Sequence, residues 1–235
     1  QISPTHLSYE PTQNVKIIGP RFLICMAITK LILGDTVLSK RYLELFNEIP
    51  DADLVNLTRK NRIFCTAYNK FLTNLLPKLP TVPKDLPTLY FVGDSHTLSY
   101  ANQQIIYNSR EWKISPKISF GLKAFHLSTS DNNEQKAVTA ANLASLPRGS
   151  IVLISVGEID CRANEGFLQA AIKKQVDIEE LVDRTVNGMF DWISEVNSVL
   201  NHDITFQNVP APVYDKHLSD TINHQVKKCI LLYNK

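Results

Sequence analysis

The stretch Leu89-Tyr90-Phe91-Val92-Gly93-Asp94-Ser95-His96 decides the fold predicted for this chain. Its apolar half predicts a buried strand. A helix is predicted to follow the turn, over Thr97-Leu98-Ser99-Tyr100. A strand that turns sharply into a helix leaves the side chain of the turn at the carboxyl edge of a sheet, beside N–H groups that stabilise negative charge. Ser95 is therefore placed like a nucleophile, although serine is also a favoured N-cap residue and this simpler role stays open.

Other strands are predicted to end at the same edge. The apolar, β-branched run 151–156 predicts a strand covered on both faces, followed by Gly157-Glu158-Ile159-Asp160-Cys161-Arg162. Residues 117–121 predict a short strand that ends at Gly121, and residues 204–209 predict a fourth strand. Open α/β sheets bind ligands outside the carboxyl ends of their strands, so these strand ends predict a site.

The order of these motifs resembles the SGNH (GDSL) hydrolase superfamily. Gly-Asp-Ser at 93–95, the lone Gly121 and Gly-x-x-Asp at 157–160 carry the resemblance, and with His96 and Cys161-Arg162 they are similar to a branch with GDSH and GEIDCR signatures. The similarity covers residues 86–235. It implies a three-layer, flavodoxin-like α/β domain with a parallel sheet, and a serine esterase that needs no cofactor or metal. An O-acylated glycan is the substrate class that the resemblance implies.

The resemblance also implies roles for individual residues. Ser95 matches the nucleophile, and the backbone N–H groups of Ser95 and Gly121 match two donors of the oxyanion hole. Such donors stabilise charge that develops only in the transition state. The third donor in the family is an asparagine, but Ile159 stands here and cannot donate a hydrogen bond. Arg162 is the replacement that we expect, because its guanidinium has five N–H donors.

The general base departs from the family pattern. A serine hydroxyl is a weak nucleophile until a neighbouring base takes its proton, and the family supplies a late Asp-x-x-His for this step. No Asp-x-x-His follows Asp160 in the sequence. The nearest substitutes are Asp215 with His217, and Asp220 with His224. We therefore expect the domain to be incomplete at its C-terminus.

The remaining site candidates lie within or beside the motifs. We expect His96 to contact substrate or to support the structure, since it follows Ser95 too closely to turn back easily onto its hydroxyl, and the role of general base is the alternative. His126 is either a residue at the rim of the site or an ordinary loop histidine. The carboxylates of Glu158 and Asp160 either anchor Arg162 or the turn, or contact substrate. The set assigned to substrate binding or site support is Asp94, His96, His126, Gly157, Glu158 and Asp160.

Composition limits the classes of partner. With 25 basic and 23 acidic residues among 235, the net charge is +2, which does not predict nucleic acid as a partner. The longest apolar stretch, 22–33, is too short to span a bilayer. The 4 cysteines form no C-x-x-C pair and favour free thiols in a reducing, cytoplasmic compartment, with a secreted disulfide protein as the alternative.

Residues 1–78 predict a different architecture from residues 88–235. Apolar residues recur at helical spacing over 21–46 and 54–76, with Gly34-Asp35-Thr36 as a break. This pattern resembles one tetratricopeptide-like helical pair, which could offer a surface to a protein partner. Three prolines in 79–87 predict an extended linker. A catalytically weak domain that binds carbohydrate, or a scaffold built on these helices, is the alternative to an esterase.

Overall fold

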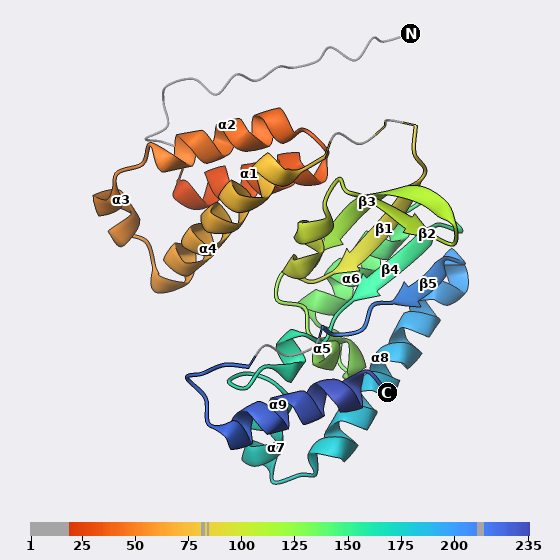
Figure 1. Ribbon diagram of the computed structural model, residues 1–235. Helices are drawn as coiled ribbons and strands as arrows, with labels where there is room; N and C mark the ends of the chain where they lie inside the picture. Colours follow the sequence, from red (N-terminus) through yellow and green to blue (C-terminus); the bar gives the residue numbers. More distant parts are fainter. Residues whose placement is uncertain (1–18, 81–82, 84, 211–213) are drawn as a thin grey trace. The chain divides into compact units, whose positions relative to one another are not determined.

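The computed structural model describes residues 19–80, 83, 85–210 and 214–235 (Figure 1). The chain divides into two compact units, residues 1–81 and 82–235. Their boundary falls within the proline-rich segment 79–87, of which residues 81, 82 and 84 lie outside the described part.

The first unit is helical. Its elements are α1 (Pro20–Ile32), α2 (Thr36–Asn47), α3 (Asp51–Val55), α4 (Arg59–Leu75) and the 3₁₀ helix η2 (Leu76–Lys78). The predicted break between the first two helices is confirmed, because the carboxylate of Asp35 caps α2 by accepting the N–H of Leu38 at 3.0 Å. Thr58 caps α4 through the N–H of Asn61. Both caps satisfy backbone donors that a helix start leaves free.

The second unit has a mixed α/β fold built on a five-stranded sheet of order β2-β3-β1-β4-β5. The strands are β1 (Thr88–Gly93), β2 (Gln104–Tyr107), β3 (Arg110–Ile118), β4 (Ile151–Ser155) and β5 (Asp203–Phe206). β3, β1, β4 and β5 run parallel, and only β2 is antiparallel to its neighbour. The predicted strands at 151–156 and 204–209 are confirmed in place, each slightly shorter than predicted.

The segment between β1 and β3 differs from the prediction. A short strand was expected over 117–121, whereas β3 begins at Arg110 and already ends at Ile118. β2 and β3 form a hairpin whose turn residues, Asn108 and Ser109, have φ values of 48° and 59°. Two consecutive residues with positive φ are typical of the type I′ turn, which matches the twist of paired strands.

The helices of this unit are α5 (Ala124–Ser128), α6 (Glu134–Ala144), α7 (Phe167–Lys174), α8 (Ile178–Leu200) and α9 (Asp220–Tyr233). α7 and α9 pack against each other and against α8 in a cluster apart from the strands. Figure 1 shows α6 and α8 along the sheet, and Met189 and Ile193 of α8 share a core with Val92 and Val152 of the strands. On the opposite face, Phe91 packs against the ring of Tyr100. Among the described helices, none is long and apolar enough to cross a membrane.

Candidate functional site

Backbone hydrogen bonds bring three strand ends together at the carboxyl edge of the sheet. The N–H of Ser119 donates to the carbonyl of Gly93 at 2.8 Å, and the N–H of Asp94 donates to the carbonyl of Ser155 at 3.3 Å. A Cβ atom on Gly93 would lie 2.0 Å from the same Ser155 oxygen, so only glycine fits there. The segments that follow β3, β1 and β4 therefore start side by side, as the sequence motifs predicted.

Ser95 begins a 3₁₀ helix, η3 (Ser95–Tyr100), and not an α-helix. Asp94 is the N-cap, since its carboxylate accepts the N–H of His96 at 2.8 Å, so the N-cap role considered for Ser95 belongs to its neighbour. The side chain of Ser95 is half-buried. Within the described residues its hydroxyl has no hydrogen-bond partner, whereas Ser99 donates to the carbonyl of His96 at 2.6 Å. The Ser95 hydroxyl is therefore free to meet a ligand.

His96 links the strand ends of β1 and β4. Its Nδ1 lies 3.0 Å from Oδ1 of the buried Asp94, and its Nε2 lies 3.8 Å from Oε2 of Glu158. The hydrogen bond to Asp94 raises the pKa of His96, burial opposes this shift, and the charges of both carboxylates add to it. The imidazole is thus held by one nitrogen, with the other nitrogen at the surface of the site.

Arg162 is enclosed by two carboxylates. Its Nη2 lies 2.8 Å from Oε2 of Glu158, its Nε donates to the same atom at 3.0 Å, and its Nη1 donates to Oε1 of Glu165 at 2.7 Å. Lys123 extends this network, with Nζ 3.7 Å from Oε2 of Glu165. The guanidinium predicted as the third oxyanion donor therefore already directs its N–H groups at carboxylates, and the buried Ile159 offers no donor.

Asp160 joins the segment after β4 to the segment after β3. Its two oxygens accept the N–H groups of Ala124 at 2.7 Å and Phe125 at 3.1 Å, in the first turn of α5. Burial raises the pKa of Asp160 to about 6, although both N–H groups favour the charged form. Asp160 thus supports the site by fixing the loop that follows Gly121, and it does not hold Arg162. Gly121 is exposed with φ +71°.

His126 has a structural role within the same loop. Its Nδ1 accepts the N–H of Lys123 at 3.2 Å, which caps the start of α5. Burial lowers the pKa of His126, and the charge of Lys123 lowers it further. A neutral imidazole is the form that can accept this hydrogen bond.

Tyr233, which the sequence analysis missed, closes the turn after β4. Its hydroxyl donates to the carbonyl of Val156 at 3.0 Å. Gly157 has φ +108°, and a Cβ atom there would lie 2.3 Å from the ring of Tyr233. The last turn of α9 thereby fixes the 157–162 turn. A tyrosine at the end of an amphipathic helix carries no sequence signal for such a contact.

A cavity of about 560 Å³ opens beside this edge. Its polar wall includes His96, Glu158, Arg162 and Asn164, and its apolar wall includes Val209, Leu218, Val226 and Ile230. Ser95 stands next to the His96 wall and is not itself part of the lining.

Asp215 and His217, the first pair considered in place of the late Asp-x-x-His, separate in the structure. Asp215 lines the cavity beside the sheet edge, whereas the exposed His217 does not. Oδ1 of Asp215 accepts the backbone N–H of His217 at 2.9 Å, which is a turn contact. The side chain of Asn223 holds this loop through the N–H and the carbonyl of Asp215.

Asp94, His96 and Glu158 also bring one possible ligand atom each within 4.8 Å of one another. Sequence spacing did not indicate this cluster, because the fold alone brings Glu158 to the other two residues. Two oxygens and a histidine nitrogen are ligands that divalent metals accept. Arg162 argues against a cation, since its guanidinium already compensates the charge of Glu158 at 2.8 Å.

Comparison with known proteins adds no relative. No family model matches the chain, and no curated protein and no solved structure is significantly similar to it.

Proposed function

We propose that the unit 82–235 is a serine ester hydrolase of the SGNH (GDSL) type, with Ser95 as the nucleophile. One observation carries the proposal: the half-buried hydroxyl of Ser95 stands unpartnered among the described residues at the carboxyl end of β1, where three strand ends meet. A serine needs such a position, because the attacked carbonyl must approach both the hydroxyl and nearby N–H groups.

The order of the strands supports this proposal. If the four parallel strands are counted along the chain, their order in the sheet is 2-1-3-4, which is the start of the flavodoxin-like order. Sheets of this type bind ligands where the order reverses, which here is between β1 and β4. His96 follows β1 and Glu158 follows β4, so both lie at this position.

The proposed reaction is acyl transfer in two steps. Ser95 Oγ forms a bond to the ester carbonyl carbon while its hydroxyl proton passes to a water molecule, the carbonyl oxygen takes the π electron pair, and the N–H groups of Ser95 and Gly121 stabilise the resulting charge. Collapse of this intermediate breaks the bond to the alcohol oxygen, which takes that proton back. Water then attacks the acyl-enzyme, which releases the carboxylic acid and returns a proton to Ser95. His96 is assigned to substrate contact because it lines the cavity. We expect slow turnover of a simple acetyl ester, since His217 does not reach this cavity.

The cavity wall supports an acylated glycan as the substrate class. Asn164 and Asp215 offer polar groups to sugar hydroxyls, whereas Val226 and Ile230 offer an apolar surface to the acyl group. Few polar groups set on an apolar wall are typical of small-molecule sites.

A second candidate function is binding of such a glycan without efficient cleavage. The specific observation in its favour is the missing third donor. Ile159 is buried and Arg162 is engaged by Glu158 and Glu165. Loss of one oxyanion donor typically costs about 3 kcal/mol of transition-state stabilisation.

A fluorophosphonate probe tests the nucleophile directly. We expect labelling of the chain at Ser95, mapped by peptide mass spectrometry, and complete loss of labelling in Ser95→Ala. Ser99→Ala is the matched control, because its hydroxyl lies in the same 3₁₀ helix but is bonded to the carbonyl of His96. Absence of labelling beside an active control esterase would favour the binding function.

A further inference from the structure

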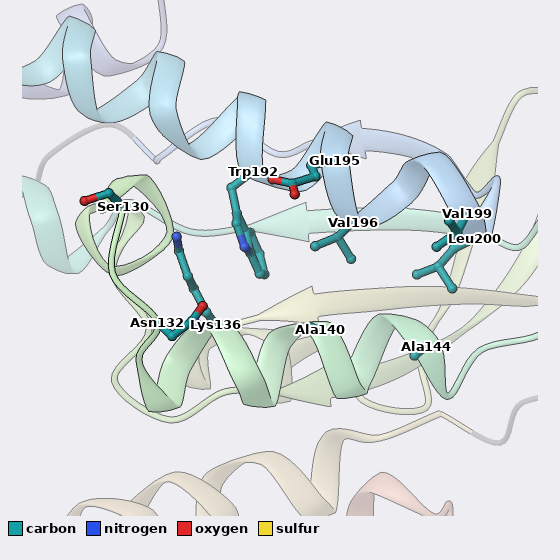
Figure 2. Close-up of a pocket in the computed structure, with 10 residues that line it drawn as sticks. All are labelled: Ser130, Asn132, Lys136, Ala140, Ala144, Trp192, Glu195, Val196, Val199 and Leu200. Atoms are coloured by element: carbon teal, nitrogen blue, oxygen red, sulfur yellow. The ribbon is translucent and has the colours of Figure 1, made fainter.

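A second cavity, of about 480 Å³, lies between α6 and α8 and shares no lining residue with the cavity at the sheet edge (Figure 2). Its volume is in the range of small-molecule sites. Figure 2 shows that the two ends of this groove differ in chemistry. Ser130, Asn132 and Lys136 stand at one end, and the apolar Ala144 and Leu200 stand at the other.

Lys136 is the unusual residue of this groove. Its side chain is buried, with only 7% of the residue exposed, and Figure 2 shows it extending toward Trp192. Its ammonium donates to the carbonyl of Thr129 and lies 5.6 Å from the centre of the Trp192 ring. Among the described residues no carboxylate forms an ion pair with it. A buried cation without a counter-charge is energetically unfavourable.

The position of Lys136 in its helix adds to this imbalance. Asn133 is the N-cap of α6, which places Lys136 in the first turn. The N-terminal end of a helix carries a partial positive charge, so a cation there is disfavoured and an anion is favoured. Glu195 also borders the groove, but it is an exposed residue of α8 and forms no ion pair with Lys136 among the described residues.

We propose that this groove binds a medium-chain fatty carboxylate. Its carboxylate would accept hydrogen bonds from the free N–H groups of Lys136, since an ammonium has three donors and the protein accepts one of them. Its alkyl chain would lie along Ala140, Ala144 and Val196. From Lys136 to Ala144 the helix rises by about 12 Å, close to the length of a medium-length alkyl chain. This inference does not depend on the esterase proposal.

Titration with sodium octanoate tests the proposal. Trp192 serves as the fluorescent reporter after Trp112→Phe, because the chain has 2 tryptophans. We expect saturable binding of octanoate, binding at least about tenfold weaker for octanol, which lacks the charge, and no saturation by acetate, which lacks the chain. Equal binding of octanoate and octanol would overturn the role of Lys136, and no saturation by octanoate would overturn the site.

Three variants assign the binding to the groove. Lys136→Met should weaken octanoate binding at least about tenfold and leave octanol binding unchanged. Ala144→Trp should abolish octanoate binding by filling the apolar end, while Ala141→Trp should not, since Ala141 is exposed on the same helix outside the groove lining. If Lys136→Met fails to fold, as judged by circular dichroism, the alanine pair decides: equal loss in both variants would overturn the proposal.

Discussion

The carboxyl edge of the sheet and the groove between α6 and α8 differ in whether their charged side chains have partners of opposite charge. The charged side chains at the edge form a continuous series of ion pairs, which we call the edge network: Asp94, His96, Glu158, Arg162, Glu165 and Lys123. Each member has a charged atom within 4 Å of an oppositely charged group. In the groove, Lys136 has no such partner among the described residues. Paired charges fix the shape of a site, whereas an unpaired charge leaves its strongest interaction to a ligand.

The backbone shows the same contrast. At the edge, two glycines lie so close to other atoms that a Cβ atom would not fit. Gly93 lies against the backbone of Ser155, and Gly157 lies against the ring of Tyr233. The groove is bordered by the alanines Ala140 and Ala144, which leave space above the helix. A rigid edge and an open groove should therefore respond differently to added or removed groups.

The largest effect is expected for Gly93→Ala. The new Cβ would lie 2.0 Å from the Ser155 carbonyl oxygen, a backbone atom held in the sheet, so we expect a loss of about 3 kcal/mol or more in the free energy of unfolding, or no soluble protein. Urea denaturation measures the loss. Gly121→Ala is the matched control, because its Cβ would meet open space and only its φ of +71° is unfavourable, at about 1 kcal/mol. Equal losses would show that the edge is not rigid.

A smaller effect, visible in its pH dependence, is expected for Asp160→Asn. The folded pKa of about 6 exceeds the ordinary 3.8, so Asp160 stabilises the fold most when protonated, and this contribution is lost as the pH rises through 6. The free energy of unfolding of the unsubstituted protein, minus that of Asp160→Asn, should therefore fall by up to about 3 kcal/mol between pH 4 and pH 7. Urea denaturation at both pH values measures it. A constant difference would contradict the raised pKa.

Local signals explain which parts of the fold were predictable. The apolar runs before Gly93 and Gly157 act within a few residues, and β1 and β4 lie where these patterns place them. The β2–β3 hairpin was missed, although Asn108-Ser109 directly after the run 105–107 is a turn signal. Its register depends on pairing with β1, which no local pattern specifies.

The site was predictable only at the level of segments. The rule for strand ends brought Gly93, Gly121 and Gly157 to one region, because it depends on topology. The partners of Arg162 and Asp160 were not predictable, since each carboxylate could reach several donors and side-chain geometry chose among them. Lys136 likewise carries no sequence signal, because only the fold places Trp192 of α8 beside it.

The smallest effects give the most direct test of the comparison, through the sign of two matched substitutions. Arg162→Met leaves Glu158 and Glu165 without their partner, and because these groups are partly exposed we expect a loss of about 0.5–1 kcal/mol that shrinks at high salt. Lys136→Met removes a buried cation from a helix N-terminus and one donor from a carbonyl, so we expect no loss of stability or a gain of a few tenths of a kcal/mol. Thermal unfolding without added ligand measures both. If Lys136→Met lost as much stability as Arg162→Met, the Lys136 ammonium would already be stabilised by the protein itself. It would then have no strong interaction left for a carboxylate ligand.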